Sequence, residues 1–370
     1  MRIALLHPTY WPEVQRGSER WIHDLGIVLA GRGHDVTVLT THPGPFSADS
    51  EDGIRVVRSR RLPQPPTLGL HEDWLGNVPT LAWHLLRGNF DLAHAFHLSS
   101  AWTAVQVHRA GGPPVAFNFQ GMPTREHLVA RRYRLEMLQT VVASGAASCM
   151  ISEAAAELFR RYLLREPEIL PGGVLAAEFA VEEPRAEPPT LICAASIGDP
   201  RKRGGLMLDA FRLLRKRRPD VQLEVTRTAD PHLSPYSFEL PAGARWIEPG
   251  STEDLAHAYA RASASVLAAR DEPFGLVLVE SLAAGTPVAA ARSGSCPEIL
   301  DRPQLGALFD GDDPEALAAA MDEALELGGQ EGTAAACRER AMEYDWSRVV
   351  ERYQAVYERV VAAPSLTGAG

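Results

Sequence analysis

The sequence predicts an α/β protein made of two Rossmann-like domains, each built on a doubly wound parallel sheet. Its length of 370 residues exceeds what one hydrophobic core usually supports. Short apolar segments typical of buried strands alternate with longer segments in which apolar residues recur at helical spacing. This alternation is typical of parallel βαβ units. The polar, proline-rich stretch EEPRAEPP at 182–189 divides the alternation into two halves and predicts an interdomain linker.

In the first half, the segment 2–7 is a short apolar run that predicts a buried strand. The segment 19–32 then places Trp21, Ile22, Leu25 and Leu29 on one helical face and ends at two glycines. The same criteria predict further strands at 35–41, 54–58, 92–96, 115–119 and 149–152, and further helices at 78–87, 99–110 and 125–143.

The second half repeats the pattern. The predicted strands are 191–195, 222–226, 244–247, 265–268 and 288–290, and the predicted helices include 204–217, 252–261 and 276–283. A last amphipathic helix is predicted at 346–361. We therefore expect a first domain at 1–183, a second at 184–345, a separate terminal helix at 346–362 and a disordered tail at 363–370.

Composition excludes several classes of protein. The formal net charge of -10 does not favour binding to nucleic acid. The four cysteines are scattered, which predicts neither a zinc site nor a disulfide framework and suits the cytoplasm. No apolar run is long enough for a signal peptide or a membrane span. The first predicted strand is not followed by GxGxxG, which disfavours an NAD enzyme.

The segment EPFGLVLVE at 272–280 gives the strongest local signal for a site. Glu272 follows a predicted strand, and Gly275 allows close approach of the backbone. The amides of Phe274, Gly275 and Leu276 open a predicted helix, where unpaired N–H groups can bind sugar or phosphate oxygens. Glu280, further along this helix, could contact a second part of the same ligand. The spacing alone is equally compatible with a capped amphipathic helix that carries two ordinary glutamates.

The basic loop DPRKRGG at 199–205 gives a second signal. Arg201, Lys202 and Arg203 lie between a predicted strand and a predicted helix. Cations together with the amides of a helix N-terminus suit a diphosphate, and they would stabilise charge that develops on a leaving diphosphate. A solvated turn is the alternative. Another basic run, at 215–218, ends a predicted helix and complements its dipole, so we assign it no function.

The segment 272–280 resembles the EX7E signature of the retaining glycosyltransferase family 4, which has the GT-B fold. The resemblance extends over nearly the whole chain, through LAGRGHDVTVLT at 29–40, FDLAHAFH at 90–97, ILPGGV at 169–174 and DWSRVVERY at 345–353. It implies two domains facing a central cleft, with the terminal helix crossing back onto the first. It also implies that Glu272 contacts the transferred sugar and that Glu280 contacts the ribose of the nucleotide.

The resemblance implies a retaining transfer of a hexose from a nucleotide-diphosphate sugar to a hydroxyl acceptor. The expected catalytic residues are Glu272, Lys202 and Arg201; the expected donor-binding residues are Gly17, Ser18, Arg203, Phe274, Gly275, Leu276 and Glu280. Gly17 and Ser18 correspond to a glycine-rich loop of the family. No metal is expected, because no Asp-x-Asp pair is suitably placed. Asp312 and Asp313 precede Pro314 and predict a helix N-cap instead.

The acceptor side departs from the family pattern. His97, Asn118 and Gln120 are the candidates, but Gln120 stands where the family commonly has histidine, and Ser196 stands near the position of its usual arginine. Glutamine cannot act as an acid or base. A silent nucleotide-sugar-binding protein, or a phosphorylase or epimerase on the same fold, therefore stays open. The arginines at 125–134 favour a solvated helix face, although a peripheral contact with the inner membrane surface is the alternative.

Overall fold

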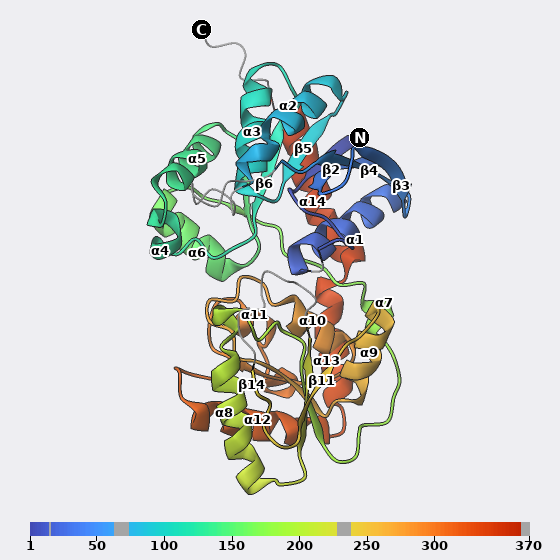
Figure 1. The fold of residues 1–370 in the computed structure, drawn as a ribbon, viewed down its shortest axis with the longest axis vertical. Helices are drawn as coiled ribbons and strands as arrows, with labels where there is room; N and C mark the ends of the chain where they lie inside the picture. Colours follow the sequence, from blue (N-terminus) through green and yellow to red (C-terminus); the bar gives the residue numbers. More distant parts are fainter. Residues whose placement is uncertain (15, 63–73, 228–237, 364–370) are drawn as a thin grey trace. The chain divides into compact units, whose positions relative to one another are not determined.

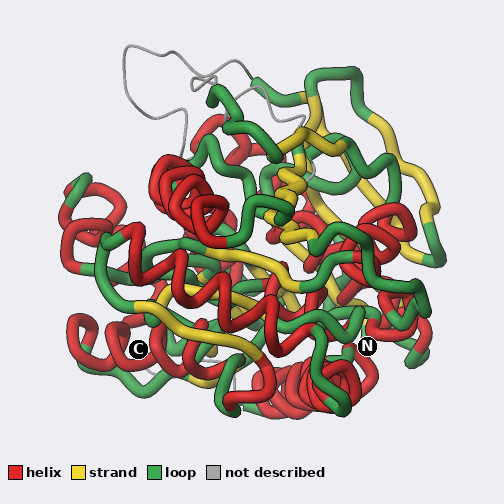
Figure 2. The backbone as a smooth tube through the Cα atoms, turned by 90° about the horizontal axis from the view of Figure 1, so that it is seen from below, coloured by secondary structure: helices red, strands yellow, loops and turns green. Residues whose placement is uncertain are grey.

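The computed structural model describes residues 1–14, 16–62, 74–227 and 238–363. The chain forms two compact units, shown in Figure 1. Unit 1 contains the described residues of Met1–Gly172 and Trp346–Gly370, and unit 2 is Gly173–Asp345. Helices and strands alternate along both units. Figure 2 colours the helices, strands and loops of the chain by type. Residues 364–370, most of the predicted tail, lie outside the described residues.

The described residues of unit 1 form an eight-stranded sheet with the order β3-β4-β2-β1-β5-β6-β7-β8. Its strands are parallel except β3, which pairs antiparallel with β4. Its elements are β1 Arg2–Leu6, α1 Gly17–Gly31, β2 Asp35–His42, β3 Ser47–Glu51, β4 Ile54–Arg60, a 3-10 turn Leu75–Asn77, α2 Val78–Arg87, β5 Leu92–Ala95, α3 Leu98–Arg109, β6 Val115–Phe119, α4 Arg125–Val129, α5 Arg132–Ala143, β7 Ala147–Met150, α6 Glu153–Leu163, β8 Glu168–Ile169 and α14 Trp346–Ala362.

Two predictions for unit 1 need correction. The single helix predicted at 125–143 is two helices, α4 and α5, because Arg131 between them has an extended backbone with φ -145° and ψ 122°. Strand β3 was not predicted, since its sequence SADSE lacks apolar alternation and mostly faces solvent. It is an edge strand, where the hairpin with β4 rather than burial defines the element.

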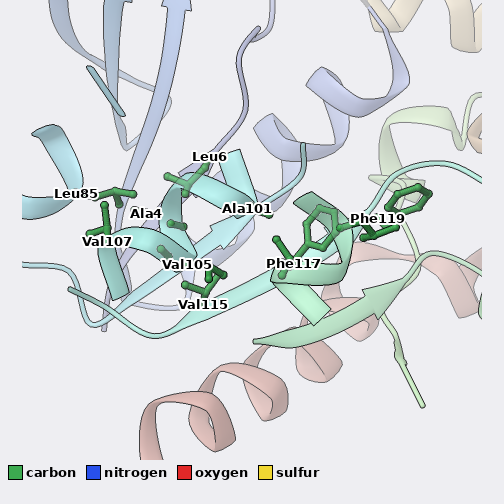
Figure 3. Close-up of a cluster of buried hydrophobic side chains, with 14 of the residues drawn as sticks. Ala4, Leu6, Leu85, Ala101, Val105, Val107, Val115, Phe117 and Phe119 are labelled. Atoms are coloured by element: carbon green, nitrogen blue, oxygen red, sulfur yellow. The ribbon is translucent and has the colours of Figure 1, made fainter. Parts of the chain in front are cut away.

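The core of unit 1 lies between its sheet and the helices that cover it. Alternate residues of the central strands point to the same side: Ala4 and Leu6 from β1, and Val115, Phe117 and Phe119 from β6. Figure 3 shows them together with side chains of α2 and α3. The intervening residues of both strands are buried too, as expected for parallel strands whose two faces are covered.

Helix α14 confirms the prediction that the terminal helix packs on the first domain. Its aromatic residues Trp346, Tyr353 and Tyr357 are fully buried. The Tyr353 hydroxyl lies 3.1 Å from Nε1 of Trp21 on α1 and 3.0 Å from the carbonyl of Pro171. The Tyr357 hydroxyl lies 2.7 Å from Nδ1 of His94 on β5. Burial lowers the pKa of His94 to about 3, so this imidazole is neutral inside the unit.

Replacing Tyr353 with phenylalanine is expected to lower the free energy of unfolding by about 1–3 kcal/mol. The substitution removes one hydroxyl that accepts from Trp21 and Asn118 and donates to the Pro171 carbonyl, all without access to water. Urea denaturation measures the loss. Tyr162→Phe, at a partly exposed position on α6, is the control and should change stability little. Equal stability of the two variants would contradict the role given to this hydroxyl.

The described residues of unit 2 form a six-stranded parallel sheet with the order β11-β10-β9-β12-β13-β14. Its elements are α7 Ala176–Phe179, β9 Thr190–Cys193, a 3-10 turn Pro200–Lys202, α8 Gly204–Arg217, β10 Gln222–Thr226, β11 Ala244–Ile247, α9 Thr252–Arg261, β12 Ala264–Leu267, α10 Leu276–Ala283, β13 Val288–Ala291, α11 Cys296–Ile299, a 3-10 turn Pro303–Leu305, β14 Gly306–Phe309, α12 Pro314–Gly328, α13 Thr333–Ala341 and a 3-10 turn Met342–Tyr344.

The units divide between Gly172 and Gly173, earlier than the boundary expected after residue 183. Val174 forms a β-bridge with Asp345, and the Ala176 amide donates to the Asp345 carboxylate at 3.0 Å. The stretch expected to be a linker is also fastened to unit 2. Its Arg185 donates to the carbonyls of Ala260 and Gly285 at 2.9 and 2.7 Å. Proline and charge content suggested a linker, but the partly buried guanidinium of Arg185 ties the stretch to unit 2.

In the described part of the chain, no helix has both the length and the apolar composition that crossing a bilayer requires.

Candidate donor site

Glu272 lies on the loop that joins β12 to α10 in unit 2. Its carboxylate is almost buried, and Oε1 accepts a hydrogen bond from the Gly275 amide at 3.1 Å. Its carbonyl accepts from the amide and the hydroxyl of Ser295, at 2.9 and 3.2 Å. The side chain is thus held from its own loop, and the backbone is held by the loop after β13. Because the side chain and the backbone are both held, the second carboxylate oxygen, Oε2, has a defined position from which to accept a hydrogen bond from a partner.

Lys202 provides that partner. It ends the short turn Pro200–Lys202 that follows β9, and its Nζ donates to Oε2 of Glu272 at 2.6 Å. Strands β9 and β12 are neighbours in the sheet, so the loops after them meet at its carboxyl edge. The Lys202 side chain is 17% exposed and that of Glu272 is 8% exposed. Because little of either side chain is exposed to water, this charge-assisted hydrogen bond holds Lys202 and Glu272 in a fixed relative position.

The two arginines beside Lys202 have other partners. Arg201 pairs with Asp199 at 2.7 Å, and its side chain is 54% exposed. Arg203 donates to the carbonyls of Ala268 and Gly311 and to the Asp312 carboxylate. Its guanidinium also lies 5.3 Å from the centre of the Phe309 ring. Arg203 therefore joins the loops that follow β12 and β14, and Lys202 is the cation that reaches Glu272.

Asp312 and Asp313 separate into two roles. Asp313 accepts from the Glu315 amide at 3.0 Å and caps α12, as the sequence predicted. Asp312 instead accepts from Arg203 and Arg270. The hydrogen bond from Arg203, together with the charge of Arg270, lowers the pKa of the Asp312 carboxyl. The sequence gave no sign of this ion-pair cluster, because its members lie on three separate loops.

The N-terminus of α10 borders Glu272. Gly275 precedes the helix with φ +83°, and no described side chain caps the first turn. Phe274 is buried with its ring 5.7 Å from that of Tyr344, so only its backbone is available to a ligand. Leu276 is half-buried at the start of the helix. The backbone amides here, rather than the Phe274 side chain, are the groups suited to sugar or phosphate oxygens.

Glu280 lies further along α10 and is 3% exposed. Its Oε2 accepts from the Tyr259 hydroxyl at 3.4 Å. Tyr259 is on α9, and its hydroxyl also lies 3.2 Å from the Val277 carbonyl. A buried carboxylate with a neutral phenol as hydrogen-bond donor can still accept hydrogen bonds, so it suits hydroxyl groups such as those of a ribose.

The remaining predicted site residues belong to unit 1. Gly17 and Ser18 open α1, and Ser18 donates to the Glu19 carboxylate at 3.1 Å. His97 caps α3 by accepting from the Ser99 amide. Gln120 directly follows β6, and within the described residues its amide nitrogen is buried without a hydrogen-bond partner.

Asn118 differs from the other two acceptor-side candidates. Its side chain is fully buried, and it packs under α14. Its Nδ2 donates to the Leu170 carbonyl at 3.2 Å and to the Tyr353 hydroxyl at 3.3 Å. Alternation along β6 places Asn118 toward the interior, where it supports packing of the terminal helix.

Sequence reasoning missed the turn Ser293–Ser295 that holds the Glu272 backbone. The Asp271 amide donates to Oγ of Ser293 at 2.8 Å, and Ser295 bonds to Glu272 as described above. Gly294 between them has φ +59°, and a Cβ at this position would lie 2.1 Å from the Glu272 carbonyl oxygen. The sequence SGS after a predicted strand was a usable signal of a tight turn.

Two family models match consecutive parts of this chain and together cover most of it. Residues 15–178 match the family model for Glycosyltransferase Family 4, and residues 177–344 match that for Glycosyl transferases group 1. A phosphatidyl-myo-inositol mannosyltransferase of Mycolicibacterium smegmatis is 28% identical, over 98% of this chain and 95% of that protein. A glycogen synthase of Mycobacterium tuberculosis is 27% identical, over 96% and 94% respectively.

Solved structures agree in fold. A sucrose-phosphate synthase from Thermosynechococcus elongatus matches with a TM-score of 0.80 at 20% identity, over 98% of this chain and 100% of that one. Anabaena HepE in complex with UDP-glucose matches with a TM-score of 0.70 at 16% identity, over 98% and 100%. The two consecutive family matches together span residues 15–344, so this chain belongs to the group 1, family 4 glycosyltransferases, retaining enzymes of the GT-B fold that take a sugar from a nucleotide donor.

Proposed function

We propose that this enzyme transfers a hexose, with retention and without a metal ion, from a nucleotide-diphosphate sugar to a hydroxyl of its acceptor. The observation that carries the proposal is the sheltered Lys202–Glu272 pair at the carboxyl edge of the unit 2 sheet. Ligands of open α/β sheets bind at this edge. The hexosyl donors are supported by the names of relatives, which include a mannosyltransferase and a glycogen synthase.

In the proposed reaction, the bond between the anomeric carbon and the diphosphate oxygen breaks while the acceptor oxygen bonds to the same face. The acceptor proton leaves on the departing diphosphate. Lys202 stabilises the negative charge that develops on that leaving group. Glu272 positions the sugar by accepting hydrogen bonds from its hydroxyls, and it keeps Lys202 oriented before the donor arrives. Leu276 presents its backbone amide, Gly275 holds Glu272 through its own amide, and Glu280 accepts from the ribose hydroxyls.

Of the other expected donor groups, Arg201 is a surface cation able to turn toward a phosphate, since it pairs with Asp199 on the same loop. Arg203 contributes by holding the loops around the site. Gly17 and Ser18 belong to the proposed donor loop of unit 1. His97 and Gln120 stay acceptor-side proposals, since both follow central strands of the unit 1 sheet.

A thermal-shift screen of UDP-, GDP-, ADP- and TDP-sugars tests the donor assignment. A ligand that binds the folded state raises the melting temperature, by an amount that grows with concentration over Kd. We expect the sugars of one nucleotide to raise the melting temperature of the wild type and to raise that of Glu280→Ala much less. Glu253→Ala, at the exposed start of α9, is the control and should respond like the wild type. Transfer should continue in EDTA, and NMR of the product should show the donor's anomeric configuration. Inverted product would refute the mechanism, and no shift with any sugar nucleotide would refute the function.

A further inference from the structure

A cluster of titratable side chains in unit 1 lies outside the donor site. His7 directly follows β1 and His97 follows β5, and these two strands are parallel neighbours. The two imidazole rings meet edge to face, with centroids 5.9 Å apart. Both residues therefore lie at the carboxyl edge of the unit 1 sheet, where open α/β sheets bind ligands. The sequence gave no reason to select His7, because it ends an ordinary apolar strand.

The shortest hydrogen bond of the His7 ring assigns its tautomer. Nδ1 lies 2.7 Å from the Thr9 carbonyl oxygen, which can only accept, and 3.3 Å from the Thr9 amide nitrogen, so the shorter contact assigns the proton to Nδ1. Nε2 therefore carries a lone pair. Within the described residues, every side-chain hydrogen bond of His7 runs through Nδ1. The residue as a whole is 7% exposed, and Nε2 makes no hydrogen bond in the described part of the chain.

A buried carboxylate holds this arrangement in place. Glu19, in the first turn of α1, is 1% exposed. Its Oε1 accepts from the Thr9 hydroxyl at 2.6 Å and its Oε2 accepts from the Ser18 hydroxyl at 3.1 Å. Glu19 thereby fixes Thr9, and the Thr9 carbonyl in turn fixes His7. The same carboxylate connects His7 to Ser18, which belongs to the proposed donor loop.

The charge state of His7 follows from its surroundings. Burial lowers the pKa of His7, Glu19 on α1 opposes this effect, and Arg16 at the start of α1 adds to it. His97 at the start of α3 is the other titratable group against the ring. At neutral pH the imidazole is therefore uncharged, with one fixed donor and one fixed acceptor.

We propose that His7 is an acceptor-binding residue whose Nε2 receives a hydrogen bond from a hydroxyl of a polyol acceptor, such as a sugar or cyclitol. The inference rests on the proposed function, because the bound polyol is the second substrate of the transfer. The hydrogen bond orients the acceptor and leaves the hydroxyl proton in place, so the reaction needs no base at this position. A fixed lone pair selects a hydroxyl donor and rejects a carbonyl or carboxylate at the same point.

The test measures nucleoside diphosphate release from UDP-glucose and GDP-mannose, alone and with D-glucose, D-mannose or myo-inositol. At least one polyol should accelerate release by the wild type. His7→Leu should raise the KM for that polyol about ten-fold, the value of one hydrogen bond, and change the donor KM and the release rate in water alone by clearly less. His7→Gln should retain most of the affinity, because its amide oxygen can accept from a hydroxyl.

His108→Leu is the matched control. His108 also bonds through Nδ1 to a carbonyl, that of Gly112 at 3.1 Å, but it lies near the start of β6 at the opposite edge of the sheet. It should leave the polyol KM unchanged. An unchanged polyol KM in His7→Leu, an equal loss of donor hydrolysis, or no acceleration of the wild type by any of the three polyols would overturn the inference.

Two further observations keep the outcomes separate. If His7→Leu does not fold, ¹⁵N NMR of the wild type with bound UDP provides the test instead. The His7 Nε2 resonance should shift when myo-inositol, glucose or mannose is added. A resonance that shifts with none of the three polyols overturns the inference. Failure of the wild type to bind or hydrolyse any sugar nucleotide would instead count against the proposed function. Intact hydrolysis without an effect at His7 would refute this inference alone.

Discussion

Replacing Lys202 with methionine is expected to lower kcat/KM for sugar transfer by about 100- to 1000-fold, the usual loss when a preorganised group that stabilises developing charge is removed. The loss should fall mainly on kcat, because the charge on the leaving diphosphate is largest in the transition state. Steady-state kinetics with the donor found by thermal shift measures both parameters. If kcat stayed unchanged and kcat/KM fell only because the donor KM rose, the result would contradict the catalytic role of Lys202.

The substitution also leaves the Glu272 carboxylate without its cation, so a control must separate this effect from catalysis. Arg245→Met provides it within the same unit. Arg245 pairs with Glu224 on β10, whose side chain is 8% exposed, as is that of Glu272. We expect Arg245→Met to lower stability to a similar extent and to keep full activity. Comparable losses of activity in the two variants would mean that the effect of Lys202→Met is structural.

A double variant makes the distinction sharper. If an unpaired Glu272 charge caused the loss, Lys202→Met combined with Glu272→Gln would recover activity. If Lys202 acts on the diphosphate, the double variant should be at least as inactive as Lys202→Met alone. Residues that act as one unit give strongly non-additive effects, so the expected result is a loss close to that of the worse single variant.

The sequence predicted the elements of unit 2 more closely than it predicted the site. Helices α8, α9 and α10 have the bounds that apolar spacing predicted, because each buries one face against the sheet and begins at a glycine, a serine cap or a turn. Spacing could not show which cation meets Glu272, since Lys202 and Glu272 are 70 positions apart. Their contact depends on the adjacency of β9 and β12, and strand order is a tertiary property.

The differences between the expectations and the structure have the same origin. Asn118 was one of three acceptor-side candidates, but alternation along β6 turns it toward α14, which comes more than 200 residues later. The Glu182–Pro189 stretch has the composition of a linker, yet the hydrogen bonds of Arg185 with residues 75 to 101 positions away make it part of unit 2. His7 escaped notice because its value as a ligand depends on Thr9 and Glu19, which only the folded loop brings together.

Replacing Gly294 with alanine is expected to reduce activity by about 100-fold, the cost of a displacement near 1 Å in a positioned group. The added methyl group would lie 2.1 Å from the Glu272 carbonyl oxygen and 2.6 Å from its amide nitrogen. Both are backbone atoms, so the collision is relieved only by moving the loop that carries Glu272. The Ser295 bonds that hold Glu272 would lengthen at the same time.

Gly294 also has φ +59°, so alanine adds backbone strain of about 1 kcal/mol that is unrelated to the collision. Gly332→Ala isolates this strain, because Gly332 has φ +86° at the start of α13 and an added Cβ there meets nothing within 4 Å. Assayed below both melting temperatures, Gly332→Ala should keep wild-type kcat while Gly294→Ala loses it. Equal kcat values would show that the position of the Glu272 loop does not limit transfer. Loss in Gly294→Ala alone would tie catalysis to a glycine that lets the loops after β12 and β13 approach each other.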